Sequence, residues 1–203
     1  MMKEILDAAE LYAQGLKQIE AKRDQWIEKT KELKAHLKEI ADYLNTNATY
    51  KQGFYVDTLH AFNEHFNGTC NQLSSVTFRS GDMPMLVTFK NNMGEKKDLM
   101  EHGFRIAFNP TVTGQVAVLL YPHDSELNEQ EPAFGTITVI DEPGKLTMDV
   151  VDKIIAKGMQ VAFYSSFTGI SQQAAPQETV EQVPTAKYTP IGFKHHETTQ
   201  KNN

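Results

Sequence analysis

The chain of 203 residues has a formal net charge of −6 and a pI near 5.6, with 40% hydrophobic and 23% charged residues. This composition is typical of a soluble globular protein that is long enough to bury one good-sized core. Because nucleic-acid backbones and anionic membranes attract clustered lysine and arginine, the acidic balance argues against either of them as the main partner.

The cysteine count and the apolar runs indicate a cellular compartment. Cys70 is the single cysteine, so an internal disulfide is excluded and a reducing, cytoplasmic environment is expected. No uninterrupted apolar run approaches the roughly 18 residues of a membrane span, and the first residues, MMKEILDAAELYAQ, carry too many charges for a secretion signal. We therefore expect neither a membrane protein nor an exported one.

Residues 2–44 predict one long helix. This segment has no proline, has Gly15 as its one glycine, and is rich in Lys, Glu, Leu, Ala and Gln, which favour helices. Its apolar residues follow a heptad repeat, in which positions a and d form the seam of a coiled coil. The seam residues are Met2, Ile5, Ala9, Tyr12, Leu16, Ile19, Arg23, Trp26, Thr30, Leu33, Leu37, Ile40 and Leu44.

Two polar residues, Arg23 and Thr30, interrupt this seam. In an antiparallel pair of helices Arg23 can meet Trp26 of a second copy, and a guanidinium over an indole is a favourable cation–π pair. A parallel pair instead sets Lys29 against Lys34, which repel each other. An antiparallel homodimer is therefore favoured, with interface residues Tyr12, Leu16, Ile19, Arg23, Trp26, Leu33, Leu37 and Ile40. In the alternative interpretation the helix packs on its own domain and Arg23 reaches solvent along its flexible stem.

A second amphipathic helix is predicted over residues 51–66, with Tyr55, Leu59, Phe62 and Phe66 on its apolar face. On the opposite face Asp57, His60 and Glu64 lie at positions i, i+3 and i+7, a spacing that can hold a divalent metal. Polar residues are expected on a solvent-exposed face in any case, so an ordinary surface cluster is the simpler interpretation.

Beyond residue 73 the apolar period changes to two, which predicts antiparallel strands around Val76, Val87 and Ile106. Residues 115–121, QVAVLLY, are apolar on both faces and predict a central strand, and residues 134–140 supply a fifth strand. Residues 148–167 then predict an amphipathic helix that lies on the sheet, with Thr147 as its cap and Gly158 as a place for a break.

The predicted fold class is α+β: a long N-terminal coiled-coil helix and an antiparallel sheet of about five strands, packed with two amphipathic helices. The chain divides into the helix at residues 1–46, the sheet domain at 47–169 and a disordered tail at 170–203. The tail is rich in Gln, Thr, Pro and Glu and too polar to form a core.

The remaining candidates for chemistry lie near strand ends. His102 stands in a loop, and His123 and Asp124 follow the central strand at the mouth of the sheet. Because the sequence has no nucleotide-binding loop, nucleophile elbow or metalloprotease motif, we predict a non-catalytic interaction or assembly protein without a cofactor. It homo-oligomerises through its helix and presents the sheet domain to a protein partner. The alternative is a small-molecule binding domain or an enzyme with a site near His102, His123 and Asp124.

Overall fold

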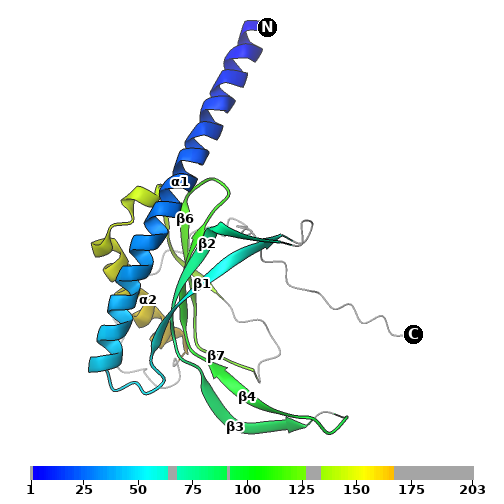
Figure 1. Ribbon diagram of the computed structural model, residues 1–203, viewed down its shortest axis with the longest axis vertical. Coiled ribbons are helices and arrows are strands. Elements are labelled where there is room, and N and C mark those ends of the chain that lie inside the picture. The colour runs from blue at the N-terminus through cyan, green and yellow to red at the C-terminus, as the bar shows by residue number, and fades with distance from the viewer. Residues whose placement is uncertain (1, 64–67, 91, 127–133, 167–203) are drawn as a thin grey trace.

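The computed structural model describes residues 2–63, 68–90, 92–126 and 134–166. Its helices are α1 (Met2–Asn47) and α2 (Met148–Ser166), with a 3₁₀ turn, η1 (Pro143–Lys145), before α2. Its strands are β1 (Phe54–Asn63), β2 (Gly68–Ser80), β3 (Met83–Lys90), β4 (Lys96–His102), β5 (Arg105–Pro110), β6 (Val116–Tyr121), β7 (Asp124–Ser125) and β8 (Gly135–Ile140). Figure 1 shows these elements in place.

The strands form two antiparallel sheets. The larger sheet has five strands in the order β1-β2-β5-β6-β8, and the smaller sheet has three strands in the order β3-β4-β7. The prediction that residues 115–121 form an interior strand is confirmed, because β6 pairs with β5 on one side and with β8 on the other. The predicted class, helices combined with antiparallel strands, is also confirmed, whereas the structure does not show a coiled coil.

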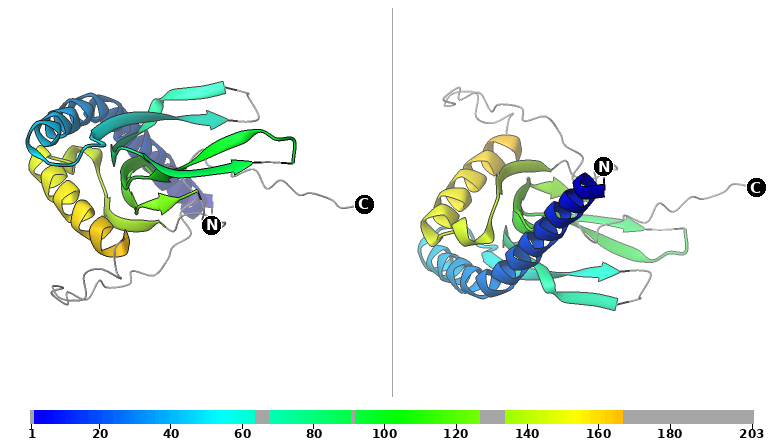
Figure 2. Two further views of the ribbon diagram at one scale, coloured as in Figure 1. Left: turned by 90° about the horizontal axis from the view of Figure 1, so that it is seen from below. Right: turned by 90° about the horizontal axis from the view of Figure 1, so that it is seen from above.

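Both helices cover the same face of the five-stranded sheet (Figure 2). The second half of α1 and the length of α2 bury their apolar stripes there, and the hydrophobic core fills the space between. The largest fully buried side chains are Trp26, Phe78, Phe108, Leu33, Leu37, Ile106 and Leu146. The first half of α1 extends beyond the sheet and away from this core (Figure 1).

Thr147 caps the start of helix α2, and Gly158 lies within the helix. The Thr147 hydroxyl accepts a hydrogen bond from the Val150 N–H at 3.4 Å, which is the predicted cap. The break considered at Gly158 does not occur, since α2 runs on to Ser166. Gly158 is instead the point of closest approach to the sheet, because a Cβ there would lie 2.5 Å from Ile106 Cδ1. A glycine lets the helix pack closely on β5.

The predicted helix over residues 51–66 is wrong, because residues 54–63 form strand β1 and residues 68–80 form strand β2. The segment FYVDTLHAFN is rich in aromatic and β-branched residues, which favour strands. Tyr55 and Leu59 are four residues apart, a spacing that places two side chains on one face of a helix and equally on one face of a strand. Pairing with β2, in the register Phe54↔Ser80 to Asn63↔Gly68, selects the strand.

The predicted division of the chain includes a tail at residues 170–203 and a boundary between residues 46 and 47. The tail at 170–203 lies outside the described residues. The boundary at 46/47 falls at the end of α1, yet Trp26, Leu33 and Leu37 belong to the same core as the sheet, and the division into domains stays a prediction. In the described part of the chain, neither helix is both long and apolar enough to cross a membrane.

Candidate functional site

The heptad seam of α1 lies in two different environments. In the second half, Trp26 is 1% exposed and Leu33 and Leu37 are fully buried against the chain's own sheet. The Trp26 indole N–H donates a hydrogen bond to the Ser74 carbonyl at 3.1 Å. A pairing in which Leu33 meets Leu16 of a second copy would require Leu33 to leave this core. Trp26, Leu33 and Leu37 cannot pack in both places at once.

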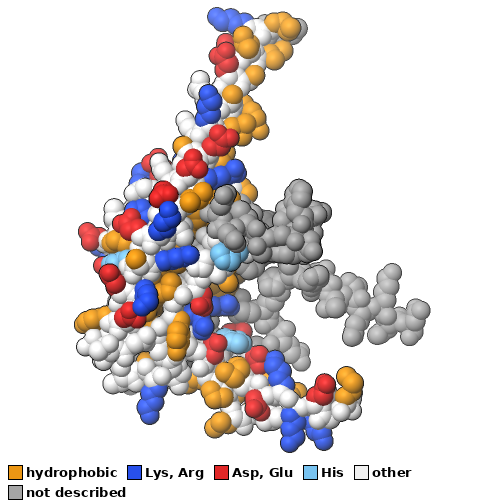
Figure 3. All heavy atoms as spheres, viewed as in Figure 1, with side chains coloured by type: hydrophobic (Ala, Val, Ile, Leu, Met, Phe, Trp, Pro, Cys, Tyr) orange, Lys and Arg blue, Asp and Glu red, His pale blue; other side chains and the backbone are white. Residues whose placement is uncertain are grey.

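Residues 2–19, which we call the arm, are exposed apart from Gly15 and Ile19, which are half-buried. Large apolar side chains of the arm lie in solvent: Met2, Ile5, Leu6, Leu11, Tyr12 and Leu16. Figure 3 shows hydrophobic side chains gathered mainly along one side of the projecting part of α1. A contiguous exposed apolar surface of this kind is uncommon on monomeric proteins.

Arg23 and Thr30, the two polar residues of the seam, both find partners within the chain. An Arg23 Nη donates to the Val112 carbonyl at 3.2 Å, in the turn between β5 and β6. The same turn approaches α1 so closely that a Cβ on Gly114 would lie 2.6 Å from Lys22 Cβ. The Thr30 hydroxyl donates to the Trp26 carbonyl at 2.7 Å. Arg23 therefore contacts the β5–β6 turn of its own chain, although its Nε is buried without a hydrogen-bond partner among the described residues.

The helical spacing predicted for Asp57, His60 and Glu64 does not occur, because Asp57 and His60 lie in strand β1. Asp57 accepts a hydrogen bond from Arg79, and His60 Nδ1 lies 2.7 Å from the Ser74 hydroxyl. Glu64 lies outside the described residues. Among the residues that the structure describes, no group of three His, Cys, Asp or Glu side chains is arranged to hold a metal ion.

The structure places His102 at the end of strand β4, rather than in the predicted loop, and Asp124 at the start of β7, with His123 in the connection directly before β7. His102 is the Cα partner of Asp124 where β4 pairs with β7. The two imidazole rings nevertheless turn to different carboxylates: His102 Nδ1 lies 3.5 Å from Asp82 and its Nε2 3.8 Å from Glu126, whereas His123 Nε2 lies 3.7 Å from Glu101.

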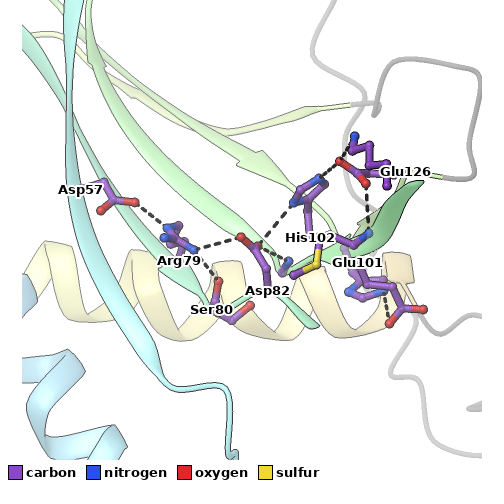
Figure 4. Close-up of polar contacts among 12 residues, drawn as sticks. Asp57, Arg79, Ser80, Asp82, Glu101, His102 and Glu126 are labelled. Carbon is purple, nitrogen blue, oxygen red and sulfur yellow. Dashed lines mark hydrogen bonds and ion pairs between the residues drawn. The ribbon is translucent and has the colours of Figure 1, made fainter. Parts of the chain in front are cut away.

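His102 belongs to a chain of polar side chains that joins the two sheets (Figure 4). Arg79 pairs with Asp57 and lies 3.7 Å from Asp82, which in turn faces His102. At the far end, Glu126 accepts hydrogen bonds from Lys97 Nζ and from the Met100 N–H, both at 3.0 Å. These two hydrogen bonds hold the pKa of Glu126 below its usual value, and the bond from Lys97 has the larger effect. These contacts connect β2 with β4 and with Glu126, the residue that follows β7.

An apolar cavity of about 230 Å³ opens at the C-terminal end of α2. It is lined by Tyr50, Phe54, Ser80, Phe104, His123, Met159, Ala162, Phe163 and Ser166. Of the predicted site residues, only His123 is among them. The other lining residues could not be predicted from the sequence. They come from distant parts of the chain, and no short motif indicates that they meet.

Comparisons with protein-family models, with curated proteins and with solved structures find no match to this chain.

Proposed function

We propose that this protein is a non-catalytic assembly protein, in which the arm of α1 pairs with the arm of a second copy and the sheet domain contacts a protein partner. The observation that carries this proposal is the division of one heptad seam. Its second half is covered by the sheet, whereas in its first half Ile5, Tyr12 and Leu16 are exposed. A continuous apolar stripe that is only half covered supports a partner for the remainder.

A second copy of the chain fits the arm in an antiparallel register. Seam positions a and d face each other in such a pair, so Met2 meets Ile19, Ile5 meets Leu16 and Ala9 meets Tyr12, with each contact repeated by the two-fold axis. The flanking positions bring Leu6 to Ala13 and Ala8 to Gly15. These flanks are small or apolar and carry no like charges, so the two helices can approach closely. This register replaces the one through Arg23 and Trp26.

The charge of the arm favours a protein partner over a lipid surface. Interfacial helices that bind anionic membranes carry lysine and arginine on their polar face. In the arm the polar positions are instead more acidic than basic, with Glu4, Asp7 and Glu10 against Lys3 and Lys17.

Nucleation of a free helix is costly, but here the turns of α1 that pack on the sheet supply the nucleus for the arm. The arm is therefore pre-formed for pairing.

The β3–β4 hairpin supports contact with a further protein. Several of its apolar side chains lie in solvent: Leu86, Val87, Phe89 and Met93. Strand β3 is at the edge of the three-stranded sheet, and an edge strand can accept a strand from another protein. The hairpin extends from the side of the molecule opposite the helices (Figure 2). The arm and the hairpin can thus bind different partners at the same time.

Sedimentation equilibrium tests the self-association of the full chain. We expect a dimer for the wild type and for Gln14→Glu, which adds a charge on the outer face of the arm. Leu16→Glu adds the same charge to the seam. Because burying a leucine contributes about 1.5–3 kcal/mol, this variant should weaken the dimer at least about tenfold. A wild-type chain that sediments as a monomer at all concentrations would refute self-association through the arm.

A further inference from the structure

Aromatic rings and the Met159 thioether, rather than acidic or basic groups, form most of the lining of the cavity at the end of α2. Phe54 and Phe104 form one wall, with ring centroids 6.4 Å apart, and Tyr50 joins Phe54 at 5.4 Å. Met159, Ala162 and Phe163 close the opposite side from α2. Aromatic walls of this kind favour a flat apolar molecule, which can pack against the faces and edges of the rings.

Polar contacts behind the walls hold the cavity open in a fixed shape. The Asn45 side chain binds the Phe54 backbone at both its N–H and its carbonyl. The Tyr50 hydroxyl donates to the Gly81 carbonyl at 3.2 Å, and the Ser80 N–H donates to the Phe104 carbonyl at 3.1 Å. A ligand therefore meets pre-positioned walls, which lowers the entropic cost of binding.

The polar groups at the cavity determine what a ligand must carry. The Ser166 hydroxyl accepts a hydrogen bond from the His123 N–H at 3.0 Å, and a hydroxyl that accepts one hydrogen bond can also donate its own proton. The lining residues include no lysine or arginine, so an anion would lose its hydration in the cavity without a permanent opposite charge to replace it. The cavity thus suits a neutral molecule with a hydrogen-bond acceptor that faces Ser166.

We infer that this cavity is a binding site for a neutral, flat, apolar molecule with one hydrogen-bond acceptor. A cavity of about 150 Å³ accommodates benzene. By the same proportion, 230 Å³ holds a ligand of roughly ten non-hydrogen atoms. A bicyclic ketone has this size and chemistry. The site is independent of the arm, and its test does not depend on whether the protein self-associates.

Two-dimensional amide NMR of the full chain, titrated with three bicyclic probes, tests this inference. The probes are 1-indanone, which is neutral and has a carbonyl; indane, which lacks the acceptor; and indane-2-carboxylate, which is an anion. We expect 1-indanone to shift the amides of Phe104 and Ala162, indane to bind about threefold to tenfold more weakly, and the carboxylate to bind more weakly still. The absence of shifts with 1-indanone, or equal binding of the carboxylate, would overturn the inference.

Variants locate the site. Ala162→Leu places a larger side chain in the cavity and should abolish the shifts caused by 1-indanone. Should this variant fail to fold, Ser166→Ala provides a second test, because it removes the donor and should weaken 1-indanone, but not indane, by about threefold to tenfold. Ser165→Ala is the matched control, since Ser165 is the exposed preceding residue of α2 and does not line the cavity. Unchanged binding of 1-indanone to the folded Ala162→Leu or Ser166→Ala variant would contradict the assignment.

Discussion

Asn45 holds Phe54 through both ends of its side-chain amide. The Asn45 Oδ1 accepts a hydrogen bond from the Phe54 N–H at 2.7 Å, and its Nδ2 donates to the Phe54 carbonyl at 3.0 Å. This pair connects the last turn of α1 with the first residue of β1, across a turn that contains Gly53 at φ +75°. It also positions the Phe54 ring, which is a wall of the cavity.

Replacing Asn45 should therefore destabilise the junction between helix and sheet. In Asn45→Ala both hydrogen bonds are lost, and we expect the free energy of unfolding to fall by about 1–3 kcal/mol. Urea unfolding followed by circular dichroism measures this change. Asn47→Ala is the control, because Asn47 bonds only to the Tyr43 carbonyl of its own helix at an exposed site. Equal losses in the two variants would show that the bond to Phe54 has no special role.

Gly158 and Ile106 should behave as a coupled pair. A methyl group at residue 158 meets Ile106 Cδ1, which is fully buried, so Gly158→Ala should destabilise the chain by about 1–3 kcal/mol despite the better helix propensity of alanine. Ile106→Val removes that same Cδ1. The double variant should recover at least half of the loss caused by Gly158→Ala, as measured by a double-mutant cycle in urea. Strictly additive effects would contradict this account of the contact.

The elements that could be predicted from the sequence are those with one dominant signal. β6 is apolar on both faces, a pattern that indicates an interior strand, and Thr147 stands where an amphipathic pattern begins. The helix predicted over residues 51–66 was wrong because the aromatic spacing of residues 54–63 fits both a helix and a strand. Pairing with β2 decides between the two. Long-range partners of this kind are not visible in a local pattern.

The heptad seam shows a second limit of prediction from the sequence. A repeat shows which face of α1 is apolar, but it does not show whether a second copy or the chain's own sheet covers that face. Trp26 and Leu33 face the sheet, while Tyr12 and Leu16 on the same stripe do not. The cavity was missed for a similar reason, since Phe54, Phe104 and Met159 meet only after the chain has folded.

Leu86 should be under backbone strain. It adopts φ +59° and is 92% exposed, so it has a left-handed conformation without a packing contact within its own chain to offset the cost. We expect Leu86→Gly to stabilise the chain by about 0.5–1 kcal/mol in urea unfolding. Val87→Gly, at the next residue, should instead destabilise the strand. A loss of stability in Leu86→Gly would show that the leucine side chain is not dispensable for the fold.

Lys97 should control the titration of Glu126. The pKa of Glu126 is lowered in the folded chain mainly by its hydrogen bond from Lys97, so the paired carboxylate stabilises the fold above its unfolded pKa and loses this contribution as the pH falls through the folded pKa. In Lys97→Met we expect the pKa of Glu126 to rise toward its ordinary value. Carboxyl NMR across the acid range measures this, with Lys96→Met as the control. An unchanged pKa in Lys97→Met would contradict the assignment.

Distances between spin labels on two copies of the arm distinguish an antiparallel pair from a parallel one. Glu10 and Lys3 occupy the same position of successive heptads, so labels on cysteines placed there, in a Cys70→Ser background, differ only in their place along the arm. With Met2 opposite Ile19, Glu10 faces residue 11 of the second copy, whereas Lys3 faces residue 18 and lies about 22 Å along the axis from its own copy.

For the antiparallel pair we expect a dipolar coupling at both sites, with the distance between the two labels about 10 Å longer at residue 3 than at residue 10. Equal distances at the two sites would mean that the arms run parallel. The absence of coupling at both sites, at concentrations where the chain is fully folded, would contradict the claim that the arm joins two copies.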